Sequence, residues 1–227
     1  MGGIPTDVNG RVLSDEKNTV LPGVYAAGEA ACVSVHGANR LGTNSLLDIV
    51  VFGKRAGESM LEYVSKTKST SISDSAADDL VNKINNLIEK DHTDEFSVGR
   101  IRNDLQESME ENAKIFRSEE TLSKQTEILE NLRERYENVT IFDKGKVFNT
   151  ELMEAIELDY LLDMSESTVA SALARKESRG AHSRQDFPDR DDGNFMKHSF
   201  AFKNGNSANL RYKDVELGKY EPMERKY

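Results

Sequence analysis

The apolar residues between positions 80 and 136 recur at the spacing of an α-helix, and this period limits the possible folds more than any other feature of the chain. Three successive stripes have this spacing: Leu80, Ile84, Leu87 and Ile88; Val98, Ile101, Leu105, Met109 and Phe116; and Leu122, Leu129, Leu132 and Tyr136. A one-sided apolar stripe is stable only when it is buried against another apolar face. We therefore expect three amphipathic helices, joined by short loops, to pack together as a bundle.

Further helical and linker signals flank these stripes. Ser118 is a suitable N-cap for the third helix, and a fourth helix is predicted from Thr150 to about Arg175. Residues 66–75 are rich in Ser, Thr and Lys and contain one apolar residue, which is typical of a linker.

The helical period stops after Arg175. Residues 177–194 are dense in charge, Gly and Pro and predict an irregular loop, and Lys203-Asn204-Gly205-Asn206 predicts the turn of a hairpin. These changes in pattern divide the chain into four regions: 1–65, a linker at 66–75, a helical bundle at 76–175, and a C-terminal loop and hairpin region at 176–227.

Short apolar runs and turn residues alternate in the first 57 positions. Asn9-Gly10 predicts a hairpin turn between residues 4–8 and 11–13. Pro22-Gly23 then predicts a turn before an apolar run at residues 24–27. This run predicts a buried strand of an α/β sheet that ends at Gly28-Glu29.

The composition excludes several classes of protein. With 30 Lys+Arg against 40 Asp+Glu, the formal charge is −10 and the pI is about 5.0, which argues against binding to nucleic acid. The lone Cys32 excludes an internal disulfide, fits a reducing compartment, and reads as a small buried apolar residue. No spacing of His, Cys or carboxylates predicts a metal site. The longest apolar stretch, residues 46–52, contains Asp48 and is too short to span a bilayer, and the N-terminus does not resemble a signal peptide.

The chemical signals lie in residues 24–57. Glu29, at the expected carboxyl edge of a sheet, can accept hydrogen bonds from ribose or ribityl hydroxyls, or it can be a solvated strand-end residue. Arg40 lies in a glycine-interrupted loop before a helix capped by Asn44 or Ser45. Its planar guanidinium suits a carboxylate, but it can also be a surface charge, and His36 in the same loop can be structural.

Three sequence blocks carry a resemblance to a known family. The first is Gly28-Glu29 followed by SVHGANRLGTNSLLDIVVFG (residues 34–53), the second is RKESRGAHSRQDFPDRDD (residues 175–192), and the third is YEPMERKY (residues 220–227). In this order they resemble the succinate dehydrogenase and fumarate reductase flavoprotein subunits. Phe195, where a Trp is common, and Thr43, where a smaller residue is common, depart from the family pattern.

The resemblance implies a fold and a set of roles. The fold is an α/β closing segment of an FAD-binding domain, followed by a helical bundle domain and a small α+β C-terminal domain. Glu29 matches the FAD-binding glutamate, and Ser45 and Leu46 match positions that contact the flavin. Arg40 matches the arginine that binds the substrate carboxylate and acts in catalysis. Arg179 and His182 match a characteristic block without an assigned chemistry. They could support the active-site loop or face the iron–sulfur subunit, but we favour a structural ion-pair role.

The resemblance also implies that the chain is part of a longer protein. The opening Met1-Gly2-Gly3-Ile4-Pro5-Thr6 matches an internal family stretch, so we expect the glycine fingerprint for ADP, the histidine that carries FAD and the capping domain to lie upstream. The FAD site within these residues is therefore expected to be incomplete, and the chain alone inactive.

The implied activity is oxidation of succinate to fumarate, with electrons passed to an iron–sulfur subunit and on to quinone. The implied location is peripheral, on the cytoplasmic face of a bacterial inner membrane or the matrix side of a mitochondrial one, with membrane-anchor subunits as indirect partners. Fumarate reductase is the close alternative, whereas the tail at residues 220–227 argues against L-aspartate oxidase. A non-catalytic fragment that acts only as a helical packing module is the alternative from a different class.

Overall fold

A computed structural model describes residues 2–68, 71–205, 207–219 and 222–223, and about half of the chain is helical. The helices are α1 (Asn44–Lys66), α2 (Asp78–Glu89), α3 (Val98–Ala113), α4 (Glu119–Glu137), α5 (Thr150–Ala174) and α6 (Asp192–Phe195). The strands are β1 (Ile4–Pro5), β2 (Arg11–Leu13), β3 (Val20–Tyr25), β4 (Ala31–Cys32), β5 (Phe116–Arg117), β6 (Ser183–Arg184), β7 (Lys197–Asn204) and β8 (Ser207–Asp214).

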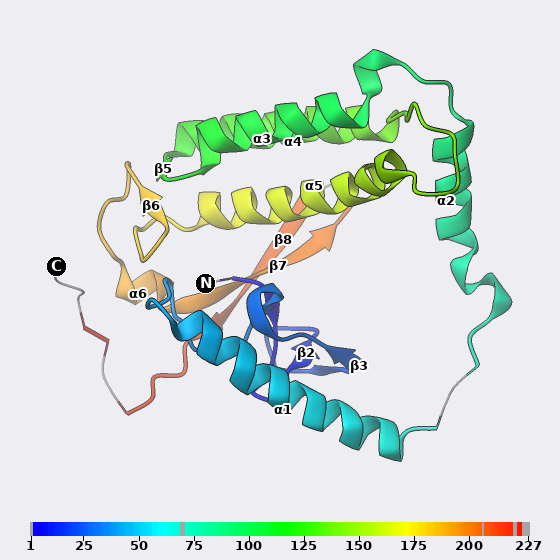
Figure 1. Cartoon of the computed structure of the whole chain (residues 1–227). Helices are drawn as coiled ribbons and strands as arrows, with labels where there is room; N and C mark the ends of the chain where they lie inside the picture. The colour runs from blue at the N-terminus through cyan, green and yellow to red at the C-terminus, as the bar shows by residue number, and fades with distance from the viewer. Residues whose placement is uncertain (1, 69–70, 206, 220–221, 224–227) are drawn as a thin grey trace.

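The elements form a helical part and an N-terminal part with a long hairpin between them (Figure 1). α3, α4 and α5 run side by side, and the β7–β8 hairpin packs against α5. On the other side of the hairpin lie the N-terminal strands and α1. None of the helices in the described ranges is both long enough and apolar enough to cross a membrane.

The core of the molecule lies within the helical part and confirms the predicted helices. α3, α4 and α5 bury one another's apolar faces, and the core includes Ile101, Leu122, Leu132, Leu158 and Leu162. Burying each such side chain contributes about 1.5–3 kcal/mol.

Three members of the predicted stripes, Leu80, Ile84 and Phe116, do not join this core. Leu80 of α2 stays half exposed, and of that helix only Leu87 is buried, because α2 crosses the end of the bundle (Figure 1). Phe116 was expected in the second helix, but it lies beyond the end of α3 in β5 and is exposed.

The helix starts follow the local capping chemistry. The Ser118 hydroxyl accepts a hydrogen bond from the Thr121 amide, and the Thr121 hydroxyl accepts one from the Ser118 amide, which forms a capping box. Asn149 caps α5 by accepting from the Leu152 amide at 2.8 Å. Ser118 is confirmed as a cap, and α5 begins at Thr150 as predicted and ends one residue before Arg175.

The predicted buried strand at residues 24–27 is wrong. β3 ends at Tyr25 and pairs antiparallel with β2, and four of its six residues are exposed. Pro22-Gly23 were expected to turn the chain before the strand but lie inside β3, and Gly23 has a positive φ of 79°. In a two-stranded ladder the run has no neighbouring strand on its second side, so its apolar residues are not enclosed.

Both predicted hairpin turns are present, with one change of partner. The β7–β8 register runs from Lys197↔Asp214 to Asn204↔Ser207, with Gly205 at φ +61° in the turn; Asn206 lies outside the described residues. At the first turn the Gly10 amide donates to the Asp7 carbonyl. Beyond an isolated bridge between Thr6 and Val12, the preceding strand β1 pairs in parallel with β4 rather than with β2.

The domain boundaries stay predictions. α1 extends to Lys66, and residues 67–68 and 71–73 belong to no helix or strand, but residues 69–70 of the expected linker lie outside the described ranges. Most of the tail block at residues 220–227 also lies outside them.

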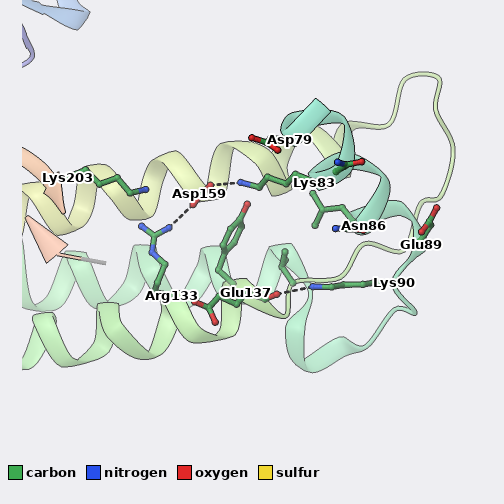
Figure 2. Close-up of a pocket in the computed structure, with 13 residues that line it drawn as sticks. Asp79, Lys83, Asn86, Glu89, Lys90, Arg133, Glu137, Asp159 and Lys203 are labelled. Atoms are coloured by element: carbon green, nitrogen blue, oxygen red, sulfur yellow. Dashed lines mark hydrogen bonds and ion pairs between the residues drawn. The ribbon is translucent and has the colours of Figure 1, made fainter. Parts of the chain in front are cut away.

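A charge network joins the bundle helices to the hairpin, and Figure 2 shows four of its members, Lys83, Arg133, Asp159 and Lys203. The Arg133 side chain of α4 is 7% exposed and donates to Asp159, Asp163 and Glu166 of α5 at 2.6–2.9 Å. Lys83 of α2 also binds Asp159, and Lys203 of β7 binds Asp163. Four of these side chains line a groove of about 780 Å³ between α2 and the bundle: Lys83, Arg133, Asp159 and Lys203.

The carboxylates of this network titrate differently. Burial raises the pKa of Glu166 above its ordinary value, and the nearby Asp163 charge adds to this, although Arg133 opposes both. Asp159 is also desolvated, but the hydrogen bond and charge of Lys83 and the charge of Arg133 hold its pKa below its ordinary value.

Replacing Arg133 by Met should destabilise the fold, because three partly buried carboxylates then lose their shared cation. We expect a loss of about 2–4 kcal/mol in the free energy of unfolding, measured by urea denaturation. The matched control is Lys54→Met, which removes the exposed Lys54–Glu58 pair of α1 and should cost less than about 1 kcal/mol. Equal losses of unfolding free energy in the two variants would show that the Arg133 network stabilises the fold no more than an exposed ion pair does.

A second buried arginine ties the end of the bundle to the C-terminal segment. Arg184 is fully buried, and its guanidinium donates to the Ala172 and Leu173 carbonyls at the end of α5, to Glu119 at the start of α4, and to both oxygens of Asp186. The hydrogen bonds from Arg184 hold the pKa of the Asp186 carboxyl far below its usual range. This side chain therefore satisfies two carbonyls of the last helical turn, which have no partner within the helix because the helix ends there.

Candidate functional site

The residues predicted to carry the chemistry gather around the first turns of α1. Glu29 lies in a 3₁₀ turn at Gly28–Ala30, and a Cβ added to Gly28 would lie 3.4 Å from the Ile49 side chain, so this turn packs on α1. Arg40 lies four residues before the helix begins at Asn44. The fold therefore brings Glu29 and Arg40 to the same end of α1 as the predicted Ser45 and Leu46.

The start of α1 has no side-chain cap. Asn44 and Ser45, the predicted caps, are both inside the helix, and the N-cap is Thr43 with a left-handed backbone (φ 68°). A capping side chain usually reaches the helix amides from an extended backbone, which Thr43 does not have. The amide of Leu46 donates to the Thr43 carbonyl at 3.0 Å and that of Asn44 to the Leu41 carbonyl at 3.3 Å, which leaves the Ser45 amide unpaired within the described part of the chain.

This helix end attracts negative charge. Unpaired amides and the aligned peptide dipoles give the N-terminus of a helix a partial positive charge. A group with an anionic or electron-rich oxygen is therefore favoured there.

The loop at residues 34–43 is attached to α1 through His36. The ring Nε2 of His36 lies 2.7 Å from Oδ2 of Asp48, and the two side chains are only 14% and 11% exposed. This pair supports the structural interpretation of His36. Arg40, further along the loop, is exposed and has no ion-pair partner among the described residues, so its guanidinium is free to bind a ligand.

The Arg179 block forms the ion pairs that the sequence predicted. Arg179 donates to both oxygens of Glu177 at 2.8 and 2.9 Å and to Asp192 at 2.7 Å. Glu177 is 0% exposed and also accepts from Arg175 and from the Asp191 amide. Burial raises the pKa of Glu177, but these hydrogen bonds outweigh burial and hold the pKa below its ordinary value. The buried carboxylate therefore stays charged.

His182 is held in its neutral form. Its Nδ1 lies 3.0 Å from an Arg117 nitrogen and must accept, because a guanidinium only donates. Its Nε2 lies 3.0 Å from the Arg175 carbonyl and must therefore carry the proton. Both ring nitrogens are satisfied in a single tautomer, and neither is left for proton transfer.

One feature of the site was missed in the sequence reading. The side chains of Leu46, Leu47 and Val50 are each more than 60% exposed, which gives α1 an apolar flank beside its N-terminus. The near-continuous apolar run at residues 46–52 was the available signal, since a helix that is apolar all round is normally buried on every side.

Comparison with known proteins decides the family. The family described as "Fumarate reductase flavoprotein C-term" matches residues 102–227, more than half of the chain, and the family described as "FAD binding domain" matches residues 1–46. The chain belongs to the succinate dehydrogenase and fumarate reductase flavoprotein subunits. The resemblance stated from the sequence blocks is thus confirmed.

Both succinate dehydrogenase and fumarate reductase flavoprotein subunits are similar to this chain. The succinate dehydrogenase flavoprotein subunit of Rickettsia bellii is 41% identical over 222 residues, which are 96% of this chain. The fumarate reductase flavoprotein subunit of Haemophilus influenzae is 38% identical over 230 residues. A solved chain of E. coli quinol fumarate reductase superposes on 98% of this chain with a TM-score of 0.88 and 37% identity. The chain spans 37% of the length of each of these three proteins.

The end of α1 fits the FAD of this flavoprotein family. An isoalloxazine ring has apolar faces, an electron-rich carbonyl edge and a polyol side chain. The apolar flank of Leu46 and Leu47 suits the faces of the ring, and the uncapped helix N-terminus suits its carbonyl edge. The exposed carboxylate of Glu29 suits the polyol side chain. FAD is therefore the cofactor class, and this chain supplies part of its site.

The neutral His182 makes the stability of this flavoprotein segment pH-dependent. Burial, with the charges of Arg117, Arg184 and Arg175, lowers the pKa of His182, so the unfolded chain binds a proton more readily than the folded one. As the pH falls below the ordinary histidine pKa of about 6.5, the free energy of unfolding should therefore decrease. His182→Gln should reduce this fall, measured by urea denaturation at pH 7.5 and 5.5.

His198, whose pKa is lowered by burial and by the charges of Lys213 and Arg175, contributes with the same sign. The double variant His182→Gln/His198→Gln should therefore show a smaller pH dependence than either single one. If the free energy of unfolding of His182→Gln fell between pH 7.5 and 5.5 by as much as that of the wild type, the neutral tautomer of His182 would be contradicted.

Proposed function

We propose that this chain forms the flavin- and substrate-facing C-terminal part of a succinate dehydrogenase flavoprotein subunit. The reaction is removal of two hydrogens from succinate to give fumarate, with bound FAD supplying the hydride acceptor. The observation that carries the proposal is the unpaired, exposed Arg40 in a loop that leads directly into the uncapped N-terminus of α1.

Arg40 is the substrate-binding and catalytic residue of this proposal. Its planar fork can hold one carboxylate of a dicarboxylate with two parallel hydrogen bonds. Such a clamp fixes the orientation of the carbon skeleton and stabilises charge that develops next to the carboxylate during hydrogen removal.

Glu29, Ser45 and Leu46 are the cofactor-binding residues. The Glu29 carboxylate would accept hydrogen bonds from ribityl hydroxyls. The amides at Ser45 and Leu46, with the dipole of α1, would stabilise negative charge at the electron-rich carbonyl edge of the flavin. Because the Leu46 amide donates to Thr43 in this structure, Ser45 is the donor most ready for this role.

The partners follow from the same proposal. Electrons leave the flavin to an iron–sulfur subunit and then to quinone, and membrane-anchor subunits hold the assembly at the bilayer. The flavoprotein would lie peripherally on the cytoplasmic side of a bacterial inner membrane, or on the matrix side of a mitochondrial one. Succinate and fumarate bind the same arginine, so fumarate reduction is the alternative direction, and relatives with the fumarate reductase name support it equally.

Arg40→Lys should abolish succinate oxidation in the FAD-loaded flavoprotein while the FAD content stays unchanged. An ammonium group cannot reproduce the two parallel hydrogen bonds, and we expect kcat/KM to fall by about 10²-fold or more. Glu29→Ala is the contrasting variant and should lose FAD instead. Turnover at the wild-type rate in Arg40→Lys would remove Arg40 from the site.

The 227-residue chain by itself should bind no FAD. Its sequence has the residues proposed for the flavin end but contains no G-x-G-x-x-G fingerprint for the ADP end. We expect the purified chain, after incubation with FAD and gel filtration, to show no flavin absorbance and no succinate-dependent dye reduction. A yellow protein would contradict this part of the proposal and would show that these residues suffice.

A further inference from the structure

The loop that carries Arg40 meets the C-terminal segment at a tight contact. Residues 179–182 form a two-residue hairpin, in which the Arg179 amide donates to the His182 carbonyl at 2.8 Å and the His182 amide donates back at 3.0 Å. Its tip, Gly180-Ala181, lies against the backbone of Ala38, and the Ala181 amide points to the Ala38 carbonyl at 3.4 Å.

The contact leaves no room for a side chain at position 180. A Cβ on Gly180 would lie 2.5 Å from the Ala38 oxygen and 2.7 Å from the Ala38 Cβ. These distances are well inside van der Waals contact. Gly180 also has a φ of +60°, which L-residues with side chains rarely adopt.

The two sides of this contact differ in exposure and in the side-chain contacts that hold them. The base of the hairpin is held by the bidentate Arg179–Glu177 pair and by both ring nitrogens of His182. The Ala38 side is an exposed loop, tied to α1 by the His36–Asp48 pair at one end. A clash at the tip would therefore be relieved by movement of the loop, and Arg40 is two residues from Ala38.

We infer that the Gly180-Ala181 tip is a positioning element for Arg40. The inference rests on the proposed function, because it assigns the tip the task of holding the carboxylate-binding guanidinium in place. The buried charges of residues 175–192 then serve the substrate site, although none of those side chains is placed in it. Gly180 is a positioning residue, and its effect on substrate passes through the loop backbone.

The first test uses trypsin on the 227-residue chain, because cleavage after the exposed Arg40 reports the order of the loop. Gly180→Ala is expected to speed cleavage at Arg40 by about fivefold, the ratio that corresponds to about 1 kcal/mol. Gly205→Ala is a matched control, since Gly205 has nearly the same φ of +61° but nothing within 4 Å of an added Cβ. It should leave cleavage at Arg40 unchanged.

The second test measures succinate kinetics and FAD content in the FAD-loaded flavoprotein. Gly180→Ala should raise the KM for succinate about tenfold, with a smaller effect on kcat and an unchanged FAD content and flavin spectrum. Gly205→Ala should match the wild type. A general loss of stability would lower FAD content and kcat together and would not produce this pattern.

If Gly180→Ala does not fold, Ala38→Val adds bulk from the loop side of the same contact, on an exposed residue. It should give the same rise in KM and the same faster cleavage. Cleavage and KM equal to those of the controls in a folded variant would overturn the inference. Failure of the wild-type flavoprotein to bind succinate would instead refute the proposed function, and the trypsin assay would still decide whether the tip orders the loop.

Discussion

The buried Arg184 guanidinium is the interaction on which the arrangement of the two ends of this chain depends. A charge without solvent must be fully hydrogen-bonded, and the five hydrogen bonds of this guanidinium go to three places: the end of α5, the start of α4 and the adjacent Asp186. Satisfying it fixes where the chain goes after α5. The segment at residues 177–192 has little regular structure, yet this one side chain gives it a defined position on the bundle.

From that anchor a series of charge contacts leads to the candidate site. Next to Arg184 along the chain, the fully buried Glu177 is bound by Arg175 and Arg179, and the neutral His182 bridges Arg117 and the Arg175 carbonyl. These contacts fix a hairpin whose tip touches Ala38 in the loop before α1. The helical bundle thereby supports the loop through a hairpin tip that is more than 130 residues away from Ala38 in sequence.

The helical part was predicted well because its information is local. The period of the apolar residues, the Ser118 capping box and the start of α5 at Thr150 are each set by residues within one or two helical turns. The errors came where distant partners decide. The run at residues 24–27 is apolar enough for a buried strand, but within the described residues the strand it belongs to pairs with β2 alone. Phe116 has the right spacing for its stripe, but α3 ends at Ala113 and the chain then pairs with β6.

The sequence by itself determined the family and the FAD-binding character of the first segment, because these depend on which side chains occur in which order, and it supplied the candidate residues as predictions. It could not determine that α1 begins without a side-chain cap, since this depends on the left-handed backbone of Thr43. Nor could it reveal that Gly180 meets Ala38, because no local pattern encodes a contact between two loops so far apart. Only the tertiary structure decided these points, through the burial and pairing of charges that bring the C-terminal segment back to the start of the chain.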